Sequence, residues 1–189
     1  SAVEGLTDTA NELFRVSVTD GDGSVSEGEI TVGVSGVNDT PTLASLAQIA
    51  YSDTASDNSF SDSTGTASAS DRDASETLTY SLNGGSTSDL AGFSSMLAGS
   101  YGTLHINGTS GAYRFVPNDT TIEAQSVNAS ENFDVVVSDA NGGSATGAIA
   151  VNITGANDAP RLKFSTLTIP STVAYTTASV TSDNLLTNP

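Results

Sequence analysis

Closely spaced carboxylates are the side chains of this sequence best suited to chemistry. Asp71 and Asp73 form an Asp-x-Asp pair ahead of a strand-like segment, and Asp39 lies in a short turn before Pro41. Carboxylate oxygens are preferred ligands of Ca²⁺, which takes about six to eight oxygens. No local segment supplies that number, so a calcium site must combine distant parts of the chain. If the folded chain brings the 71–73 loop to the same end as Asp39, the three carboxylates can share a cation.

Turn formation is the competing explanation for several of these residues. Asp in a turn hydrogen-bonds the nearby backbone, which accounts for Asp20, Asp22 and Asp139 as well as a metal role does. The segment Asp20-Gly-Asp-Gly-Ser resembles the opening of an EF-hand loop. Position twelve is Thr31, however, where that loop needs a bidentate Glu. The EF-hand interpretation therefore fails, and turn and metal roles both stay open for the three aspartates.

Residues for catalysis are scarce. His105 is the single histidine and lies between Leu104 and Ile106, where we expect an outward-facing strand residue. No Gly-x-Ser-x-Gly segment supplies a nucleophile elbow, and cysteine is absent. Asp71 and Asp73 could form the acid pair of a glycosidase, but the chain has no Trp to line a sugar cleft. We expect no enzymatic activity.

The charge balance limits the partners. The chain carries 22 Asp and Glu against 5 Lys and Arg, a formal net charge of −17. Such a field repels nucleic acid and anionic membrane surfaces and attracts cations. We therefore expect no nucleic-acid binding and no membrane insertion.

An internal repeat organises the chain. The segment from Glu12 to Pro41 aligns without a gap on the segment from Glu131 to Pro160, at an offset of 119 residues, with thirteen identities in thirty positions. A constant offset over that length identifies a tandem repeat.

Hydrophobic alternation predicts the elements of this repeat. Thr, Val, Ser and Gly are abundant, and short alternating runs are separated by turn residues every 8–12 positions. The expected fold class is all-β, a Greek-key β-sandwich of immunoglobulin or cadherin-like type in tandem repeats. Residues 83–100 are expected to form a helical turn or a packed loop. The inward residues of the strongest runs are expected to be Leu78, Tyr80, Leu82, Phe133, Val135, Val137, Ile149, Val151 and Ile153.

Three regions follow from the repeat. Residues 1–41 are expected to be the closing part of a preceding repeat, unable to form a complete sandwich because an isolated hairpin is marginal in water. Residues 42–156 are expected to form one complete unit. Residues 157–189 are expected to be a linker and the start of a further domain, with 161–170 as its first strand and a turn at 182–189.

The repeat unit resembles a known family. The segments at 71–82, 101–104, 111–117, 133–139 and 155–160 closely resemble the VCBS repeat of large bacterial surface proteins, including RTX-type adhesins. The repeats are in turn similar to cadherin domains, whose junctions are stiffened by calcium. The resemblance covers residues 42–160 and, for its second half, residues 3–41.

The resemblance to cadherin implies a ligand set at each boundary. At the first boundary the matching positions are Asn38 and Asp39 in the linker, Asp71, Asp73 and Asp139 in the next domain, and Glu4 as a sixth. Gly36 stands where the cadherin linker has its first Asp, so one ligand is missing and the number of ions stays open. The corresponding positions at the second boundary are Glu123, Asn157 and Asp158.

Two functions remain open. The resemblance implies a structural extender of an adhesin at the bacterial cell surface, secreted, with Ca²⁺ as cofactor and neighbouring repeats as partners. Adhesion and biofilm formation would follow, with host or surface glycans or proteins bound through other domains. The alternative is a ligand-binding module for carbohydrate or peptide, for which residues 83–100 are the longest available segment.

Overall fold

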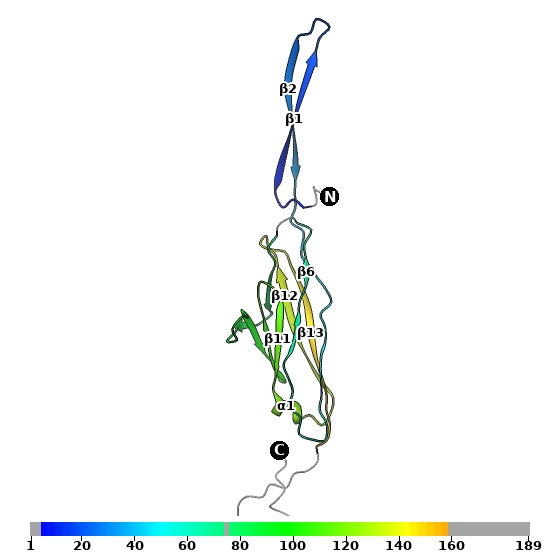
Figure 1. Cartoon of the computed structure of the whole chain (residues 1–189), viewed down its shortest axis with the longest axis vertical. Helices are drawn as coiled ribbons and strands as arrows, with labels where there is room; N and C mark the ends of the chain where they lie inside the picture. The colour runs from blue at the N-terminus through cyan, green and yellow to red at the C-terminus, as the bar shows by residue number, and fades with distance from the viewer. Residues whose placement is uncertain (1–4, 74–75, 159–189) are drawn as a thin grey trace, which may run out of the picture.

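The described residues form a long β-hairpin and, next to it along the chain, a β-sandwich. The computed structural model describes residues 5–73 and 76–158, and the hairpin projects from one end of the sandwich (Figure 1). The hairpin consists of β1 (Thr9–Thr19) and β2 (Val25–Ser35). The elements of the sandwich are, in chain order, β3 (Thr42–Leu43), β4 (Ile49–Ser52), β5 (Ser63–Thr66), β6 (Ala69–Ser70), β7 (Thr79–Leu82), β8 (Ser86–Thr87), β9 (Ser95–Ala98), β10 (Gly102–Ile106), β11 (Ala112–Pro117), α1 (Asp119–Glu123), β12 (Ala129–Ser138) and β13 (Ser144–Thr154).

Two sheets make up the sandwich. One has the strand order β4-β13-β12-β7 and the other the order β5-β11-β10-β9-β8, while β3 and β6 form a separate short ladder. The chain passes between the sheets after β4, after β5, after β7 and after β11. The strand pairs are antiparallel except β4 with β13, which run parallel. The expected all-β sandwich of immunoglobulin or cadherin-like type is confirmed.

The core lies between the inner faces of the two sheets. Phe133 and Phe115 come from opposite sheets, and their rings meet edge to face with centroids 5.7 Å apart. The alternation expected in the last two strands is confirmed, since their inward side chains are at most 2% exposed. The buried core residues of these strands and of β7, β10 and β11 are Tyr80, Leu82, Leu104, Ile106, Tyr113, Phe115, Phe133, Val135, Val137, Ile149, Val151 and Ile153.

The hairpin β1–β2 repeats the register of β12–β13. Phe14 pairs with Ile30 in the first hairpin, and Phe133 pairs with Ile149 in the second, as the 119-residue offset requires. Both tips turn through a glycine in the left-handed region, Gly23 at φ 86° and Gly142 at φ 99°. The first hairpin is not hydrogen-bonded to either sheet of the sandwich. Its apolar side chains are therefore exposed.

The segment between β7 and β10 corrects one sequence expectation and adds to another. Residues 83–100 form β8 and β9, which extend the five-stranded sheet, rather than a helical turn or loop. His105 lies on the outer face of β10, opposite to the core residues Leu104 and Ile106, as expected; it is nevertheless only 5% exposed, because this segment covers that face. Ser88 Oγ lies 2.8 Å from His105 Nδ1, and the ring of Phe93 lies 6.0 Å from the imidazole.

The remaining elements add little to this outline. Helix α1 was not expected from the sequence; Asn118 caps it by accepting a hydrogen bond from the Thr121 N–H. Across residues 5–73 and 76–158, no helix is long and apolar enough to cross a membrane. The strand expected at 161–170 and the turn at 182–189 lie outside the described residues.

Candidate metal centres

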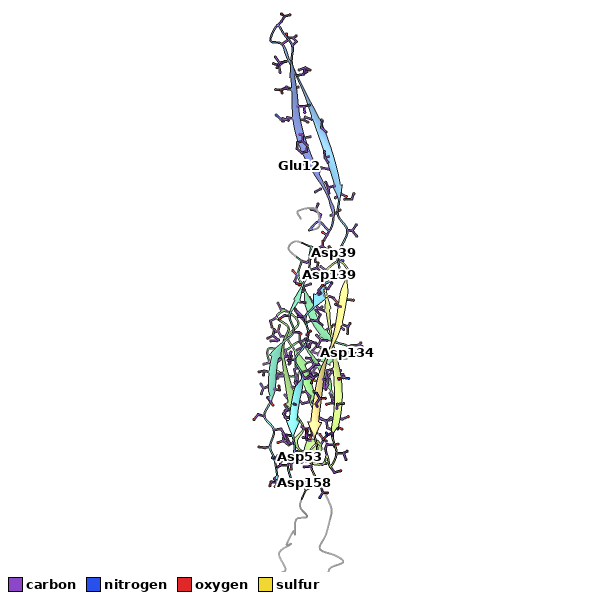
Figure 2. All side chains as sticks on the ribbon, turned by 90° about the vertical axis from the view of Figure 1, so that its right-hand side faces the viewer. Glu12, Asp39, Asp53, Asp134, Asp139 and Asp158 are labelled. Carbon is purple, nitrogen blue, oxygen red and sulfur yellow. The ribbon has the colours of Figure 1, made fainter. Side chains whose placement is uncertain are left out.

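Acidic side chains gather at the two ends of the sandwich. We call Asn38, Asp39, Asp71, Asp73 and Asp139 the proximal cluster, because they lie beside the base of the hairpin (Figure 2). We call Asp53, Glu123 and Asp158 the distal cluster, which lies at the opposite end (Figure 2). The two clusters therefore lie at opposite ends of the sandwich, and only the proximal cluster lies beside the hairpin.

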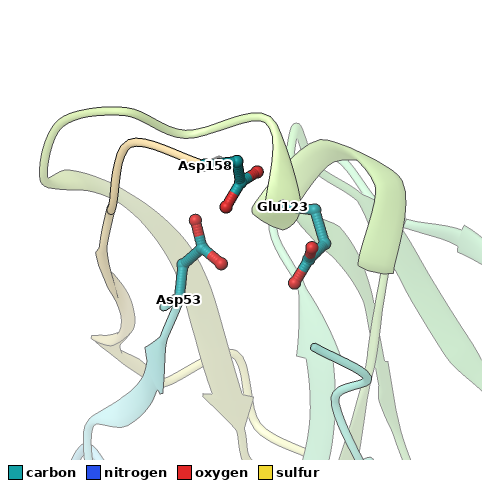
Figure 3. Close-up of side chains that lie close together, drawn as sticks. All are labelled: Asp53, Glu123 and Asp158. Carbon is teal, nitrogen blue, oxygen red and sulfur yellow. The ribbon is translucent and has the colours of Figure 1, made fainter. Parts of the chain in front are cut away.

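Parallel pairing builds most of the distal cluster. Strand β4 ends at Ser52 opposite Thr154 of β13, so the segments that follow both strands emerge at the same edge. Asp53 comes directly after β4, and its N–H donates to the Thr154 carbonyl at 2.9 Å. Asp158 follows β13, and Glu123 is the last residue of α1 at the same end (Figure 3). Three separate elements therefore each supply one carboxylate.

The spacing of the distal carboxylates suits one cation. Asp53, Glu123 and Asp158 each offer an oxygen, and these oxygens all lie within 4.8 Å of one another (Figure 3). Two ligands on opposite sides of a calcium ion are about 4.8 Å apart, since each lies about 2.4 Å from it. Within residues 5–73 and 76–158, this is the one group of three acidic or ligating side chains that meets this spacing.

Burial and, to a smaller extent, neighbouring carboxylates raise the pKa of one residue of the distal cluster. Burial raises the pKa of Glu123 above its ordinary value, the Asn58 N–H that it accepts at 2.7 Å opposes the shift, and the nearby carboxylates of Asp53 and Asp158 add to it. The shift means that the ionised cluster is unfavourable without a compensating positive charge. A bound cation would reverse the sign of that contribution.

Sequence reasoning found part of the distal cluster. Glu123 and Asp158 were expected there and Asp53 was not, although it is the most buried of the three at 5% exposure. Asp53 follows a short strand in a polar segment, and only the parallel pairing of β4 with β13 brings it to Asp158. Asn157 was expected as a ligand; its side chain is exposed and lies 3.5 Å from the Asp158 carbonyl, as a donor.

Hydrogen bonds across the linker hold the proximal cluster together. Asn38 Nδ2 donates to Asp139 Oδ2 at 3.1 Å, although the two residues are 101 positions apart. The Asp39 N–H donates to Asp73 Oδ2 at 2.6 Å, and the Asp73 N–H donates to Asp71 Oδ1 at 2.9 Å. The structure thus brings the 71–73 loop and the 139 turn to the linker, as expected. Glu4 lies outside the described residues.

Asp139 is the best-satisfied carboxylate of the proximal cluster. It is 8% exposed, and burial alone would raise its pKa. Hydrogen bonds from Asn38 and from the N–H groups of Gly143, Asn141 and Gly142 outweigh burial and lower the pKa of Asp139 below its ordinary value. This carboxylate therefore stays ionised in the fold and keeps a negative charge beside the linker.

Unsatisfied oxygens single out the candidate ligands. In the part of the chain that the structure describes, four buried side-chain polar atoms have no hydrogen-bond partner: Asn38 Oδ1, Asp71 Oδ2, Asp73 Oδ1 and Asp158 Oδ1. All four are oxygens, and all four belong to residues expected as ligands. Buried oxygens without a donor are costly, and a cation is one way to satisfy them. An all-oxygen donor set suits Ca²⁺ better than a softer metal.

The arrangement around His105 does not support nucleophilic catalysis. Ser88 Oγ and Asp89 Oδ1 lie 2.8 Å and 4.0 Å from the same nitrogen, His105 Nδ1. In a catalytic triad the acid and the nucleophile use different ring nitrogens. Ser88 is therefore a packing and hydrogen-bonding partner of the histidine.

The surface hollows offer little to a sugar or peptide. No aromatic side chain lines either of two shallow hollows that the described residues form. One is lined by Asn128, Ala129, Ser130, Asn152, Ile153 and Thr154, and the other by Ala98, Gly99, Gly102, Thr103, Val116, Pro117, Asn118 and Asp119. Aromatic anchors are typical of ligand pockets, so these hollows do not favour the ligand-binding alternative.

Comparison with known proteins gives similarity at the level of solved structures. Neither protein-family models nor curated protein sequences match the chain. It is similar to extracellular cadherin domains 1–5 of protocadherin gamma B2, with 15% identity and a TM-score of 0.42 over 79% of this chain and 26% of that one. For domains 3–6 of the same protein the values are 17% and 0.41, over 85% of this chain and 37% of that one. For domains 1–2 of human mucin-like protocadherin they are 19% and 0.40, over 78% and 69%.

Proposed function

We propose that the chain is a structural extender of a secreted bacterial surface adhesin, in which Ca²⁺ stiffens the boundaries near residues 39 and 158. The observation that carries the proposal is the set of four buried oxygens without donors, all on expected ligands. Cell adhesion and biofilm formation are the roles of such a protein, and the partners are neighbouring repeats and calcium ions.

The two clusters are complementary halves of one kind of junction. The 119-residue offset places Glu123, Asn157 and Asp158 in correspondence with Glu4, Asn38 and Asp39. Glu123 and Asp158 of the distal cluster therefore correspond to what the preceding unit contributes at the first boundary. The Asp71, Asp73 and Asp139 carboxylates are what the following unit contributes. A sandwich with one half at each end can join a neighbour at both.

Hydrogen bonds within the chain hold the candidate ligands of such a junction in place. Asn38 and Asp39 tie the linker to the sandwich through Asp139 and Asp73, which orients their remaining oxygens. Asp53 accepts hydrogen bonds from the Thr54 and Ala156 N–H groups, which fixes its carboxylate before any ion binds. A bound Ca²⁺ supplies positive charge and coordination bonds. Without it the carboxylates repel one another and the boundaries flex.

Calcium titration tests the proposal. Extracellular calcium modules bind with a Kd of about 10⁻⁴–10⁻³ M, and ligand at about a hundredfold excess over Kd adds ~2.7 kcal/mol of stability. We expect the melting temperature to rise with calcium and the heat of binding to saturate. The double variant Asp53→Asn, Glu123→Gln should lose the distal site, and Asp71→Asn with Asp73→Asn should lose the proximal one.

A matched control separates binding from a general charge effect. Asp134 is exposed on β12, between the two clusters along the molecule (Figure 2), so Asp134→Asn removes one carboxylate charge away from both clusters, against two in each double variant. Its calcium response should equal that of the wild type. If the cluster variants also respond like the wild type, the carboxylates are turn formers and the junction proposal is wrong.

Proton release gives a second readout at the distal cluster. The raised pKa of Glu123 means that, in chelator, its contribution to stability is present at low pH and is lost as pH rises through that pKa. Calcium should remove this loss and release protons on binding near that pH. Glu123→Gln should raise the melting temperature in chelator yet lower the gain from calcium. If Glu123→Gln changed the melting temperature in the same direction in chelator and in calcium, that result would argue against a cation at this site.

A further inference from the structure

The apolar face of the β1–β2 hairpin has a buried counterpart in the same molecule, on the hairpin β12–β13. Phe14, Val16 and Ile30 are 47%, 45% and 53% exposed. Their counterparts at the 119-residue offset, Phe133, Val135 and Ile149, are at most 2% exposed. The register is the same in both hairpins, so corresponding side chains lie on corresponding faces. The difference between them is what covers the face.

In the hairpin β12–β13, the inner face of the five-stranded sheet covers these side chains. Phe133 contacts the Phe115 ring of β11, and the buried Leu104 and Ile106 of β10 belong to the same core cluster. A Cβ at Gly99 would lie 2.7 Å from the Phe133 ring, so the loop after β9 also packs closely on this hairpin. The covering sheet is built entirely from residues 63–117, ahead of the hairpin in the chain.

A charged residue of the hairpin β12–β13 also contacts the loop after β9. Glu131 lies on the same face as Phe133, and its carboxylate accepts the Ser100 and Tyr101 N–H groups at 2.7 Å and 3.1 Å. The first hairpin has Glu12 at the corresponding position, and that residue is exposed (Figure 2). A carboxylate that complements two backbone donors has therefore been kept together with the apolar face.

The tips of the two hairpins match as well. Asp20 Oδ1 accepts the Asp22 and Ser24 N–H groups at 3.1 Å and 2.8 Å. Asp139 Oδ1 accepts the Asn141 and Gly143 N–H groups at 2.9 Å and 2.7 Å. The likeness thus extends over the whole length of the hairpin.

We propose that the face carrying Phe14, Val16, Val18, Ile30 and Val32 is a docking surface for a second copy of the sheet-forming segment 42–119, joined ahead of Ser1. Position 120 corresponds to Ser1 at the 119-residue offset, so that connection keeps the natural spacing. The docked segment supplies the apolar sheet that covers the face. Its loop corresponding to Ser100 and Tyr101 donates to Glu12. Binding is a completion of the sandwich and does not depend on calcium.

An extended chain tests this proposal. Residues 42–119 are added directly before Ser1, followed by residues 1–189, and hydrogen exchange is measured in chelator on this chain and on the unextended one. In the unextended chain, amides of β1 and β2 should exchange far faster than those of β12 and β13, which serve as the internal reference. In the extended chain, β1 and β2 amides should slow by about a hundredfold or more, as expected when a strand joins a cooperative core.

Two variants make the readout specific. Phe115→Asp in the added copy alone should abolish the new protection of β1 and β2 while the protection of β12 and β13 stays. Glu12→Ala in the extended chain should weaken the protection, and Glu12→Gln should restore part of it because an amide oxygen still accepts one N–H.

Three hydrogen-exchange results would contradict the docking surface. Equal exchange of β1 and β2 in the extended and unextended chains would overturn the proposal. Protection in the unextended chain that rises with protein concentration would also overturn it, since a second hairpin would then be the occupant. Protection of β1 and β2 in the unextended monomer would show that the face is covered from within the chain, which again excludes the docking surface.

Discussion

The two hairpins of this molecule are nearly the same structure in two environments. They share register, tip geometry and the alternation of apolar residues, yet one face is exposed and the other is buried. Strand pairing and turn geometry are thus set by local sequence, whereas burial depends on a sheet that the hairpin itself does not contain. The pair therefore acts as an internal control in which the same substitution can be made with and without a core.

Removing the central aromatic ring should give the largest difference between the hairpins. Phe133→Ala should cost about 3–5 kcal/mol, because a fully buried ring leaves a cavity against Phe115. Phe14→Ala should cost less than about 0.5 kcal/mol, as at an ordinary surface position. Urea unfolding of the sandwich measures both, and comparable losses would mean that the first hairpin is also packed.

The turn aspartates should differ next. Asp139 accepts hydrogen bonds from Asn38, Asn141 and Gly143, and the result is a lowered pKa. Its stabilising effect is present above the ordinary pKa and is lost as pH falls through the lowered folded-state pKa. Asp139→Asn should therefore reduce the stability at neutral pH, and the stability of the variant should depend less on pH in the acid range. Asp20→Asn, at the exposed tip of a hairpin outside both sheets, should leave the stability of the sandwich at neutral pH unchanged. Equal losses in the two variants would contradict the assignment.

Sequence patterns were informative where a side chain's role is local. Alternation predicted the inward residues of β12 and β13, and the resemblance to cadherin placed Asp39, Asp73 and Asp139 together, as the structure does. Asp53 was missed because its place depends on a parallel pairing between strands about a hundred positions apart. The burial of His105 was not foreseen, because alternation describes one sheet and cannot show that a connecting segment covers its outer face.

The paired glutamates should show a smaller contrast. Glu131→Ala leaves the Ser100 and Tyr101 N–H groups without their acceptor, which should cost about 1–3 kcal/mol if they are shielded from water. Glu12→Ala should be close to neutral in the unextended chain. Thermal denaturation of the two variants at one pH compares them directly. Equal losses of stability would mean that Glu12 also accepts hydrogen bonds from shielded donors.

The paired strand glycines should give the smallest effects, with opposite signs. A Cβ at Gly147 would lie 3.0 Å from Leu43 Cδ2, so Gly147→Ala should destabilise modestly by crowding that side chain. A Cβ at Gly28 would meet only Val16, at 3.8 Å. Gly28→Ala should therefore slow amide exchange in β1–β2 slightly, since alanine loses less backbone entropy in a strand than glycine. Faster exchange in Gly28→Ala would show that the position is crowded after all.

The parallel pairing of β4 with β13 has a mechanical consequence. Both strands run from the hairpin end of the sandwich toward the distal cluster, with β4 near the start of the domain and β13 at its finish. Tension applied at the linker before Thr42 and at Asp158 would pull these neighbours in opposite directions along their length. The hydrogen bonds between Ile49–Ser52 and Val151–Thr154 would then be loaded together in shear, rather than opened one after another from an end. A module stretched from end to end would therefore resist the pull with this whole ladder at once.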